Sequence, residues 1–405
     1  MTHVRQPEAV SPTAPVSDRA SDPAATEELR RCVRGLLGTT ADPETPFRLS
    51  EELSAARFRV MVSRHRLVPF LHTHASRLDL PTDLTYWLQM SGGSSRLRCL
   101  LLARELFRSL DVLEAAGLPV LVVKGLALAG AAHHDLAARG VGDLDLLIRP
   151  QDAARAHRAL TDAGWHAPPG YPDPSQQRVW AYAVRNGYEH AFVGSASIVD
   201  LHWRLDPTLG GLPNFDTLWT CRTSVQVDGR RVLTLSPWHA LLHSCSHAAK
   251  DDWKWLRSLV DLIVLASDAE IWSGPPRRLT RVQLASLGIA FDLLGTPGQV
   301  PAATGVAAAA AARGHLRSVR RRQSEVKLPL RARFPGAGSL HAIRRRSRGS
   351  WAPSDLRRVV FSAVVPTSLL GELADQSPPA AAATLLRLRL RSARLWFEPM
   401  MSSSA

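Results

Sequence analysis

The sequence predicts an α/β (α+β) protein in which a small mixed sheet is flanked by N- and C-terminal helical regions. An apolar run at Val120–Val123, ended by Lys124-Gly125, is typical of a short buried strand. Tyr188–Val193 and Ile198–Leu205 are two further strand-like segments, and Gly194-Ser195-Ala196-Ser197 between them predicts an antiparallel hairpin. On both sides of this central part, apolar residues recur at helical spacing. We therefore expect a sheet with helices on one of its faces.

The helical periodicity predicts a series of helices on either side of a last short strand at 231–235. They are expected at 26–37, 51–63, 68–76, 82–113 (either continuous or broken at 90–93), 126–133, 152–163, 238–248, 253–267, 277–294, 302–312 and 385–397. The chain is accordingly divided into a disordered tail (1–25), an N-terminal helical region (26–117), a sheet-containing core (118–236), a helical region (237–312), a basic segment broken by Pro and Gly and interpreted as a loop or tail-like insert (313–350), and a C-terminal helical region (351–405).

Charge and cysteine usage narrow the class of protein. The chain has 50 basic and 36 acidic residues, a net charge of +14. The segment Arg313–Arg358 holds 14 Lys and Arg but two acids, so it either binds a polyanion such as nucleic acid or forms a solvated surface. Four scattered cysteines favour a reducing, cytoplasmic compartment. We expect neither a signal peptide nor a membrane span, because no long apolar run occurs.

Two carboxylates are expected to lie side by side near the sheet. Asp143 and Asp145 alternate with Leu144 and Leu146, and residues two apart on a strand point to the same face, roughly 6.6 Å apart at the backbone. Neighbouring carboxylates repel each other unless a positive charge lies between them. A hard cation that prefers oxygen ligands, Mg²⁺ or Mn²⁺, fits that position.

Three motifs carry a resemblance to a known family. They are Lys124-Gly125 with Arg139, then Gly142-Asp143-Leu144-Asp145-Leu146-Leu147, and finally Val199-Asp200-Leu201-His202-Trp203. In this order they resemble the polymerase-beta-like nucleotidyltransferase superfamily, and more narrowly an uncharacterised bacterial nucleotidyltransferase family. The resemblance covers about Arg104 to Ala266. It implies that residues 118–236 form a nucleotidyltransferase core.

The resemblance also implies roles for individual residues. Asp143 and Asp145 would bind catalytic metals, and Asp200 would act as a third metal ligand or as the base. Where the wider superfamily has Gly-Ser, this chain has Gly125-Leu126, which lacks the hydroxyl group. Backbone N–H groups at the helix start and the Lys124 charge are expected to hold the nucleotide phosphates instead. Arg139 is expected to contact phosphate or to pair with an acid.

Several histidines are further candidates for the same cleft. His202 lies two residues after Asp200, so it shares that face and either contacts the nucleotide or fills a polar niche. His190, on the opposing strand, is a candidate to line the cleft, whereas Trp203 is expected in the core. Histidines 239, 243 and 247 share one helix face, which is compatible with zinc, with His247 facing the cleft, or with plain packing.

These observations predict a Mg²⁺-dependent enzyme that transfers an NMP group from an NTP to an acceptor. The acceptor, whether a small molecule, a peptide or an RNA, cannot be read from the sequence. The alternative is a non-catalytic nucleotide- or RNA-binding module derived from a nucleotidyltransferase, because the Gly-Ser hydroxyl is missing. The sequence holds no Walker loop, no Gly-x-Gly-x-x-Gly motif and no nucleophile elbow.

Overall fold

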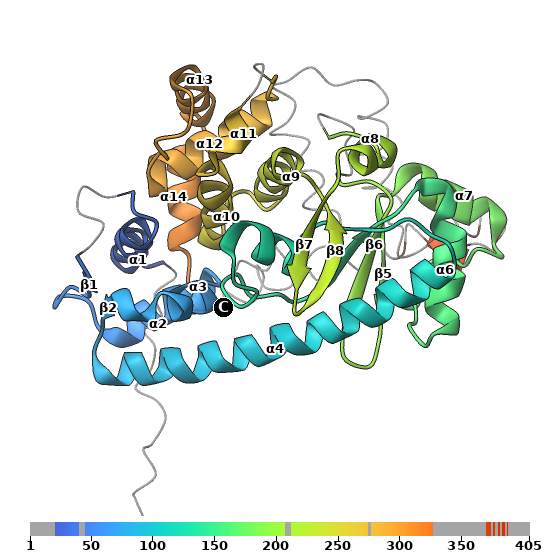
Figure 1. The fold of residues 1–405 in the computed structure, drawn as a ribbon, viewed down its shortest axis with the longest axis horizontal. Coiled ribbons are helices and arrows are strands. Elements are labelled where there is room, and N and C mark those ends of the chain that lie inside the picture. Colours follow the sequence, from blue (N-terminus) through green and yellow to red (C-terminus); the bar gives the residue numbers. More distant parts are fainter. Residues whose placement is uncertain are drawn as a thin grey trace, which may run out of the picture.

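The computed structural model describes residues 21–39, 45–206, 212–273 and 277–326, with scattered positions between 370 and 387. Its centre is a six-stranded mixed sheet in the order β5-β6-β4-β3-β8-β7 (Figure 1). The strands are β3 (Leu121–Val122), β4 (Leu144–Leu147), β5 (Glu189–Val193), β6 (Ile198–His202), β7 (Thr223–Val227) and β8 (Arg230–Thr234). The pairs β4–β6 and β3–β8 are parallel and the other neighbours are antiparallel. The predicted α/β class with a mixed sheet is confirmed.

The predicted hairpin forms with the four-residue connection that the sequence suggested. Val193 pairs with Ile198, and the register continues to Glu189 opposite His202. A second hairpin, β7–β8, was predicted only in its second strand. Its turn is Asp228-Gly229, with φ of 43° and 81°, the left-handed conformations that a tight two-residue hairpin turn requires.

Most helices lie close to their predicted ranges. The described helices are α1 (Pro23–Leu36), α2 (Ala55–Arg64), α3 (Val68–Thr73), α4 (Thr82–Ala115), α5 (Gly125–Leu128), α6 (Ala153–Asp162), α7 (Gln177–Asn186), α8 (Phe215–Thr220), α9 (Pro237–Lys250), α10 (Leu256–Ala266), α11 (Ala269–Trp272), α12 (Arg281–Leu294), α13 (Ala302–Ala312), α14 (Leu316–Ser324) and α17 (Leu370–Leu373). Of the two alternatives at 90–93, the continuous helix is the one observed, since α4 runs unbroken through Gly92-Gly93. A side chain at Gly92 would collide with His72, so the glycine lets α3 pack closely on α4.

Both faces of the sheet carry helices, which corrects the expectation of one covered face (Figure 1). On one face, Leu144, Leu146, Val199 and Leu201 pack into a core that includes the C-terminal half of α4 and α6. On the other face, apolar residues of β3 and β4 pack with α8 and the start of α9. Strand alternation explains the difference, because β3 and β4 present apolar side chains to both faces, and each set needs cover.

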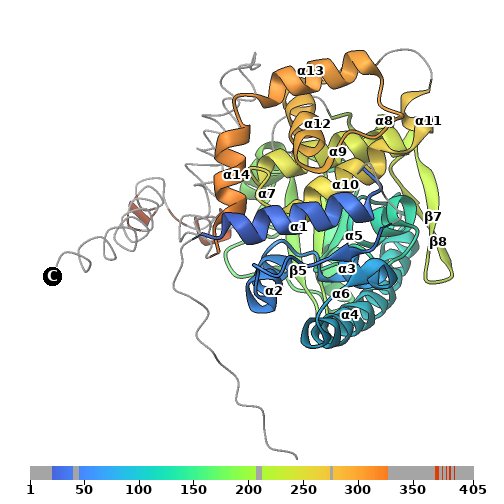
Figure 2. The same cartoon turned by 90° about the vertical axis from the view of Figure 1, so that its left-hand side faces the viewer.

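A second core joins the N-terminal helices to the C-terminal ones. Buried residues of α1, α2 and α3 share one cluster with residues of α9, α10, α12, α13 and α14, and Figure 2 shows α1 lying between α2 and the later helices. The start of the basic segment is helical, as α14, and this corrects the interpretation of 313–326 as a loop. Val319 and Gln323 are fully buried there, so an amphipathic face lies among the arginines.

The predictions for 1–20, 327–369 and most of 385–397 fall outside the described residues. Within the described ranges, no helix has both the length and the apolar character needed to cross a bilayer. A separate two-stranded parallel pair, β1 (Phe47–Arg48) and β2 (Leu78–Asp79), lies in the N-terminal part.

Candidate active site

The register of three strands brings acidic side chains to one face of the sheet. In the parallel pair β4–β6, Asp145 lies opposite Asp200. In the antiparallel pair β5–β6, Glu189 lies opposite His202. Side chains alternate along a strand, so these four residues share the face opposite to the Leu144 and Leu201 core. Asp143 is exposed directly before β4 begins.

Asp145 lies at the centre of this group. It is buried, and its Oδ1 accepts hydrogen bonds from Lys124 Nζ at 2.6 Å and from His202 Nε2 at 2.9 Å. Burial by itself would raise its pKa, but the Lys124 charge and the His202 hydrogen bond hold the pKa of Asp145 well below its ordinary value. Asp145 is therefore a carboxylate at neutral pH, and its two partners fix its orientation.

The pKa of Asp200 is shifted in the opposite direction to that of Asp145. Burial, followed by the negative charges of Glu189 and Asp145, raises the pKa of Asp200 to about 6, and the Asp143 charge adds to this effect. The face thus places three acids, Asp145, Asp200 and Glu189, beside the single charge of Lys124. A residue whose pKa is raised by its charged neighbours in such a group is a candidate for proton transfer or for cation binding.

Glu189 is a member of this group that sequence reasoning missed. Its Oε2 lies 3.3 Å from His202 Nδ1. The candidate named on this strand, His190, points to the other face, where its ring lies 5.0 Å from Phe192 and 5.4 Å from His157. Of the two neighbours on β5, Glu189 and not the candidate His190 therefore shares the face of His202. The four-residue hairpin connection fixes which residue lies opposite His202, so the register could have identified Glu189.

The Lys124-Gly125 turn links β3 to the short helix α5. Gly125 has a φ of +50°, and a Cβ there would lie 3.2 Å from Val141 Cγ1 and 3.5 Å from the Asp143 carbonyl oxygen. The glycine therefore permits both a left-handed backbone and close contact with the segment before β4. As in every helix, the first N–H groups of α5 have no partner within the helix. The turn also directs the Lys124 ammonium group at Asp145 rather than into solvent.

Arg139 pairs with a buried acid outside this group. Its Nε donates to Asp261 Oδ2 at 2.9 Å, and His133 Nε2 lies 3.0 Å from Asp261 Oδ1. Burial would raise the pKa of Asp261, but Arg139 and the His133 hydrogen bond hold it far below its ordinary value. Of the two expectations for Arg139, the structure shows pairing with an acid. The pair connects the segment before Asp143 to α10.

Two of the three α9 histidines face the same region. His243 and His247 line a narrow cavity together with Lys124, Arg139 and Asp261. Burial, followed by the Lys124 charge, lowers the pKa of both histidines well below 6.5, so both are neutral at pH 7. By contrast, His239 Nδ1 lies 2.8 Å from Ser236 Oγ at the start of the helix. As expected, Trp203 is in the core, and its Nε1 donates to the Val184 and Gly187 carbonyl oxygens.

The carboxylates can be tested for their fit to Mg²⁺. Among the described residues, no three Asp, Glu, His or Cys side chains are already arranged as ligands of one ion, either at the acids or at the histidines. The donor set on this face is nonetheless made of carboxylate oxygens, the ligands that Mg²⁺ prefers. A cation would also relieve the repulsion that raises the pKa of Asp200. The residues therefore fit Mg²⁺ in chemistry and in charge.

Comparison with known proteins agrees with this geometry. A family model described as an uncharacterised nucleotidyltransferase matches residues 51–285, which is more than half of the chain. The match is longer at both ends than the range Arg104 to Ala266 over which the sequence motifs showed the resemblance, and it includes α2 and α3. No curated protein and no solved structure matches the chain. The matched range holds every acid described above, and the chain belongs to this uncharacterised family of nucleotidyltransferases.

Proposed function

We propose that the protein is a Mg²⁺-dependent (or Mn²⁺-dependent) nucleotidyltransferase that transfers an NMP group from an NTP to an acceptor. One observation carries the proposal. Asp145 and Asp200 are register partners on β4 and β6, Lys124 donates to Asp145, and the charge of Asp143 acts on Asp200. Nucleotidyl transfer needs carboxylates that converge from neighbouring strands and a cationic group for the triphosphate, and this face offers both.

Each residue then has a definite task. Asp143, Asp145 and Asp200 would hold the metal, and Mg²⁺ bound there would neutralise the triphosphate and lower the pKa of the attacking oxygen. If Asp200 instead stays free of the metal, it would accept the proton of the acceptor group, because a pKa of about 6 leaves it mostly ionised at pH 7 but still basic. His202 and Glu189 orient Asp145, and Lys124 would contact the triphosphate.

The acceptor and the base of the NTP stay open in this proposal. A small molecule, a peptide and an RNA each offer a suitable oxygen. Purified protein incubated with each labelled NTP and cell extract, followed by identification of the labelled product, would determine both.

A non-catalytic nucleotide- or RNA-binding module is the second candidate, and a specific observation favours it. Asp145 Oδ1 is already engaged by Lys124 and His202, as expected if the pair has replaced a metal. Calorimetry with ATP, CTP, GTP and UTP, each with and without Mg²⁺, separates the candidates. An enzyme should bind one or more NTPs more tightly with Mg²⁺, whereas a decayed site should show no effect of the metal.

Substitution of the acids gives the decisive test of catalysis. Asp145→Asn and Asp200→Asn should each lower the transfer rate by about a thousandfold or more, which corresponds to about 4 kcal/mol of lost transition-state stabilisation. Asp162→Asn, at an exposed position at the end of α6, is the matched control and should keep full activity. Circular dichroism checks that the variants are folded. Full activity in folded Asp145→Asn and Asp200→Asn would refute the proposed roles.

A further inference from the structure

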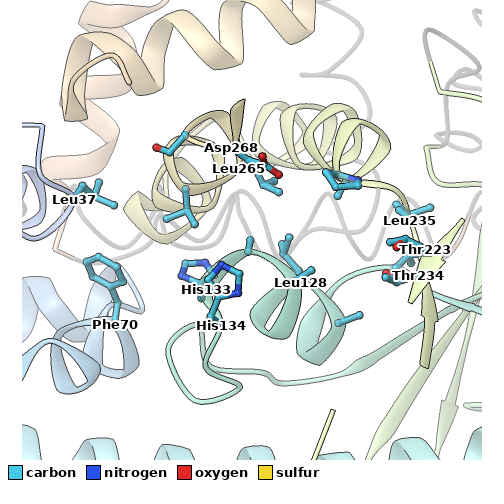
Figure 3. Close-up of a pocket in the computed structure, with 18 of the residues that line it drawn as sticks. Leu37, Phe70, Leu128, His133, His134, Thr223, Thr234, Leu235, Leu265 and Asp268 are labelled. Atoms are coloured by element: carbon cyan, nitrogen blue, oxygen red, sulfur yellow. The ribbon is translucent and has the colours of Figure 1, made fainter. Parts of the chain in front are cut away.

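A cavity of about 580 Å³ lies next to the Lys124-Gly125 turn and is lined by Val123 and Ala127 on either side of it (Figure 3). Its walls come from the end of α1, from α3, from α5 with the π-helical turn η2 (Ala129–His133), from β7 and β8, and from the helices α9 to α11. This volume lies within the range of about 300–1,000 Å³ typical of pockets for small organic ligands. Protein interiors are otherwise close-packed, so a hollow of this size calls for an explanation.

The cavity leads from solvent to the end of the sheet. Of its lining residues, six are exposed: Ala131, His134, Thr223, Ser267, Asp268 and Ala269. Val123 and Leu235, which follow β3 and β8, are buried parts of its wall. A ligand can therefore enter between η2 and α11 and place most of its surface against apolar side chains.

Small side chains and an unusual turn keep the cavity open. Five alanines line it: Ala127, Ala131, Ala132, Ala240 and Ala269. Where α5 would continue as an ordinary helix, the chain forms the π-helical turn η2 and then leaves it at His134, with a left-handed φ of 54°. Such turns cost stability and occur often at functional sites. Phe70, His133 and His134 lie together at one end of the cavity (Figure 3).

The polar groups of the lining are largely bound within the protein. Thr234 Oγ1 donates to the Val122 carbonyl oxygen at 2.6 Å, and Ser267 Oγ donates to the Ile263 carbonyl oxygen at 2.8 Å. His74 is different, because its Nδ1 donates to the Phe70 carbonyl oxygen at 2.8 Å and its Nε2 is then an acceptor. Asp268 also lines the cavity, and its Oδ1 accepts from the Glu270 N–H at 2.9 Å. The lining therefore combines apolar side chains with hydrogen-bond acceptors on His74 and Asp268.

We propose that this cavity binds a neutral, mostly apolar small molecule that donates a hydrogen bond, such as an aromatic amine or an alcohol. The site is distinct from the carboxylate face, since Asp143, Asp145 and Asp200 do not line it. Leu128 separates the two regions, because it lines both this cavity and the narrow one beside Lys124. The proposal does not rest on nucleotidyl transfer, and its test uses no nucleotide.

The test measures binding of N-phenyl-1-naphthylamine, a neutral aromatic amine whose fluorescence rises in apolar surroundings, to the full chain. Ala131→Trp and Ala269→Phe each place a large side chain in the cavity entrance from opposite walls, at exposed positions where folding should be unaffected. Ala309→Phe, on an exposed position of α13, is the matched control. Circular dichroism establishes that each variant is folded.

The wild-type protein should bind the probe saturably, with one site per chain. Both entrance variants should weaken binding by about tenfold or more, equivalent to about 1.4 kcal/mol, and the control should bind as the wild type does. Non-saturable binding to the wild type, or unchanged affinity in both entrance variants, would overturn the proposal. Such binding would then come from an exposed apolar surface, for example that of α4 with Tyr86, Met90 and Leu97.

Discussion

Lys124 and Arg139 carry the same charge and line the same narrow cavity, yet their partners give them different tasks. Lys124 pairs with Asp145, an acid of the candidate active site, and its side chain is 14% exposed. Arg139 pairs with Asp261, which is buried on α10 and also bonded to His133. A partly exposed lysine can exchange its carboxylate for a phosphate, whereas a buried arginine that holds a buried acid is part of the framework.

Substitution by methionine should separate these tasks. Lys124→Met should lower NTP affinity by about tenfold or more, because it removes the point charge for the triphosphate. It should also lower the free energy of unfolding, because it leaves the buried Asp145 carboxylate with His202 as its remaining partner. Arg139→Met should lower the free energy of unfolding by about 3–5 kcal/mol, because it leaves the Asp261 charge buried without its main partner. Calorimetry with ATP and unfolding in urea measure the two effects. If a stable Arg139→Met variant lost nucleotide affinity instead, Arg139 would be a nucleotide ligand.

At the scale of elements, local sequence signals predicted the strands that position the site. The apolar run at Val120–Val123, the alternation around Asp145 and the four-residue turn after Val193 each act over a few residues, so a single sequence reveals them. The partner of Arg139 lies 122 residues away in Asp261, and no local pattern predicts such a contact. The same holds for the hydrogen bond between His202 and Asp145, 57 residues apart.

Two elements, α14 and β7, were not predicted because their apolar periodicity is hidden by charged residues or is weak. In α14, the run of arginines suggested a solvated loop, although Val319 and Gln323 are fully buried. Strand β7 alternates weakly and is mostly exposed, so it has little apolar signal, and only its Asp-Gly turn indicated a hairpin. The site predictions depended on register rather than on element type, which is why His190 was named as a candidate and Glu189 was not.

The packing of α12 on α13 depends on one glycine. A Cβ at Gly288 would lie 2.0 Å from the Ala308 carbonyl oxygen, which is backbone and cannot rotate away. Gly288→Ala should therefore push the helices apart and destabilise the protein by about 1–3 kcal/mol or more. Gly305→Ala, in the interior of α13 with open space around it, is the control and should be neutral or stabilising by up to about 1 kcal/mol. Urea unfolding measures both, and an equal response would show that the helices do not approach so closely.

At the scale of the whole molecule, one polar network joins parts of the chain that are far apart in sequence. His65 Nε2 lies 3.0 Å from the Gln323 carbonyl oxygen of α14, and the Leu256 N–H of α10 donates to His65 Nδ1 at 3.2 Å. The Gln323 side chain accepts from Arg30 of α1 and donates to the Trp253 carbonyl oxygen. The helices before the sheet and those after it therefore form one core, and that core anchors α9 and α10, which carry His243, His247 and Asp261.

Protonation of His65 should weaken this network in acid. Burial lowers the pKa of His65 to about 3 in the folded protein, with the Arg64 charge adding to the effect, against about 6.5 in the unfolded chain. Between these values the unfolded chain binds a proton that the folded protein excludes. The free energy of unfolding should therefore fall as the pH drops below 6.5, by up to about 1.4 kcal/mol per pH unit from this residue. The stability that neutral His65 contributes is fully present only above pH 6.5.

His65→Gln tests this, because glutamine keeps a donor and an acceptor but does not titrate. Its free energy of unfolding in urea, measured at pH values from 7 to 4.5, should decline less steeply than that of the wild type. At pH 7 the variant should be the less stable of the two, since its side chain fits the buried site less well, and the two curves should converge or cross in acid. His166→Gln, at an exposed position, should keep the wild-type slope. Parallel curves for wild type and His65→Gln would mean that His65 is not held neutral at the junction of the two helical regions.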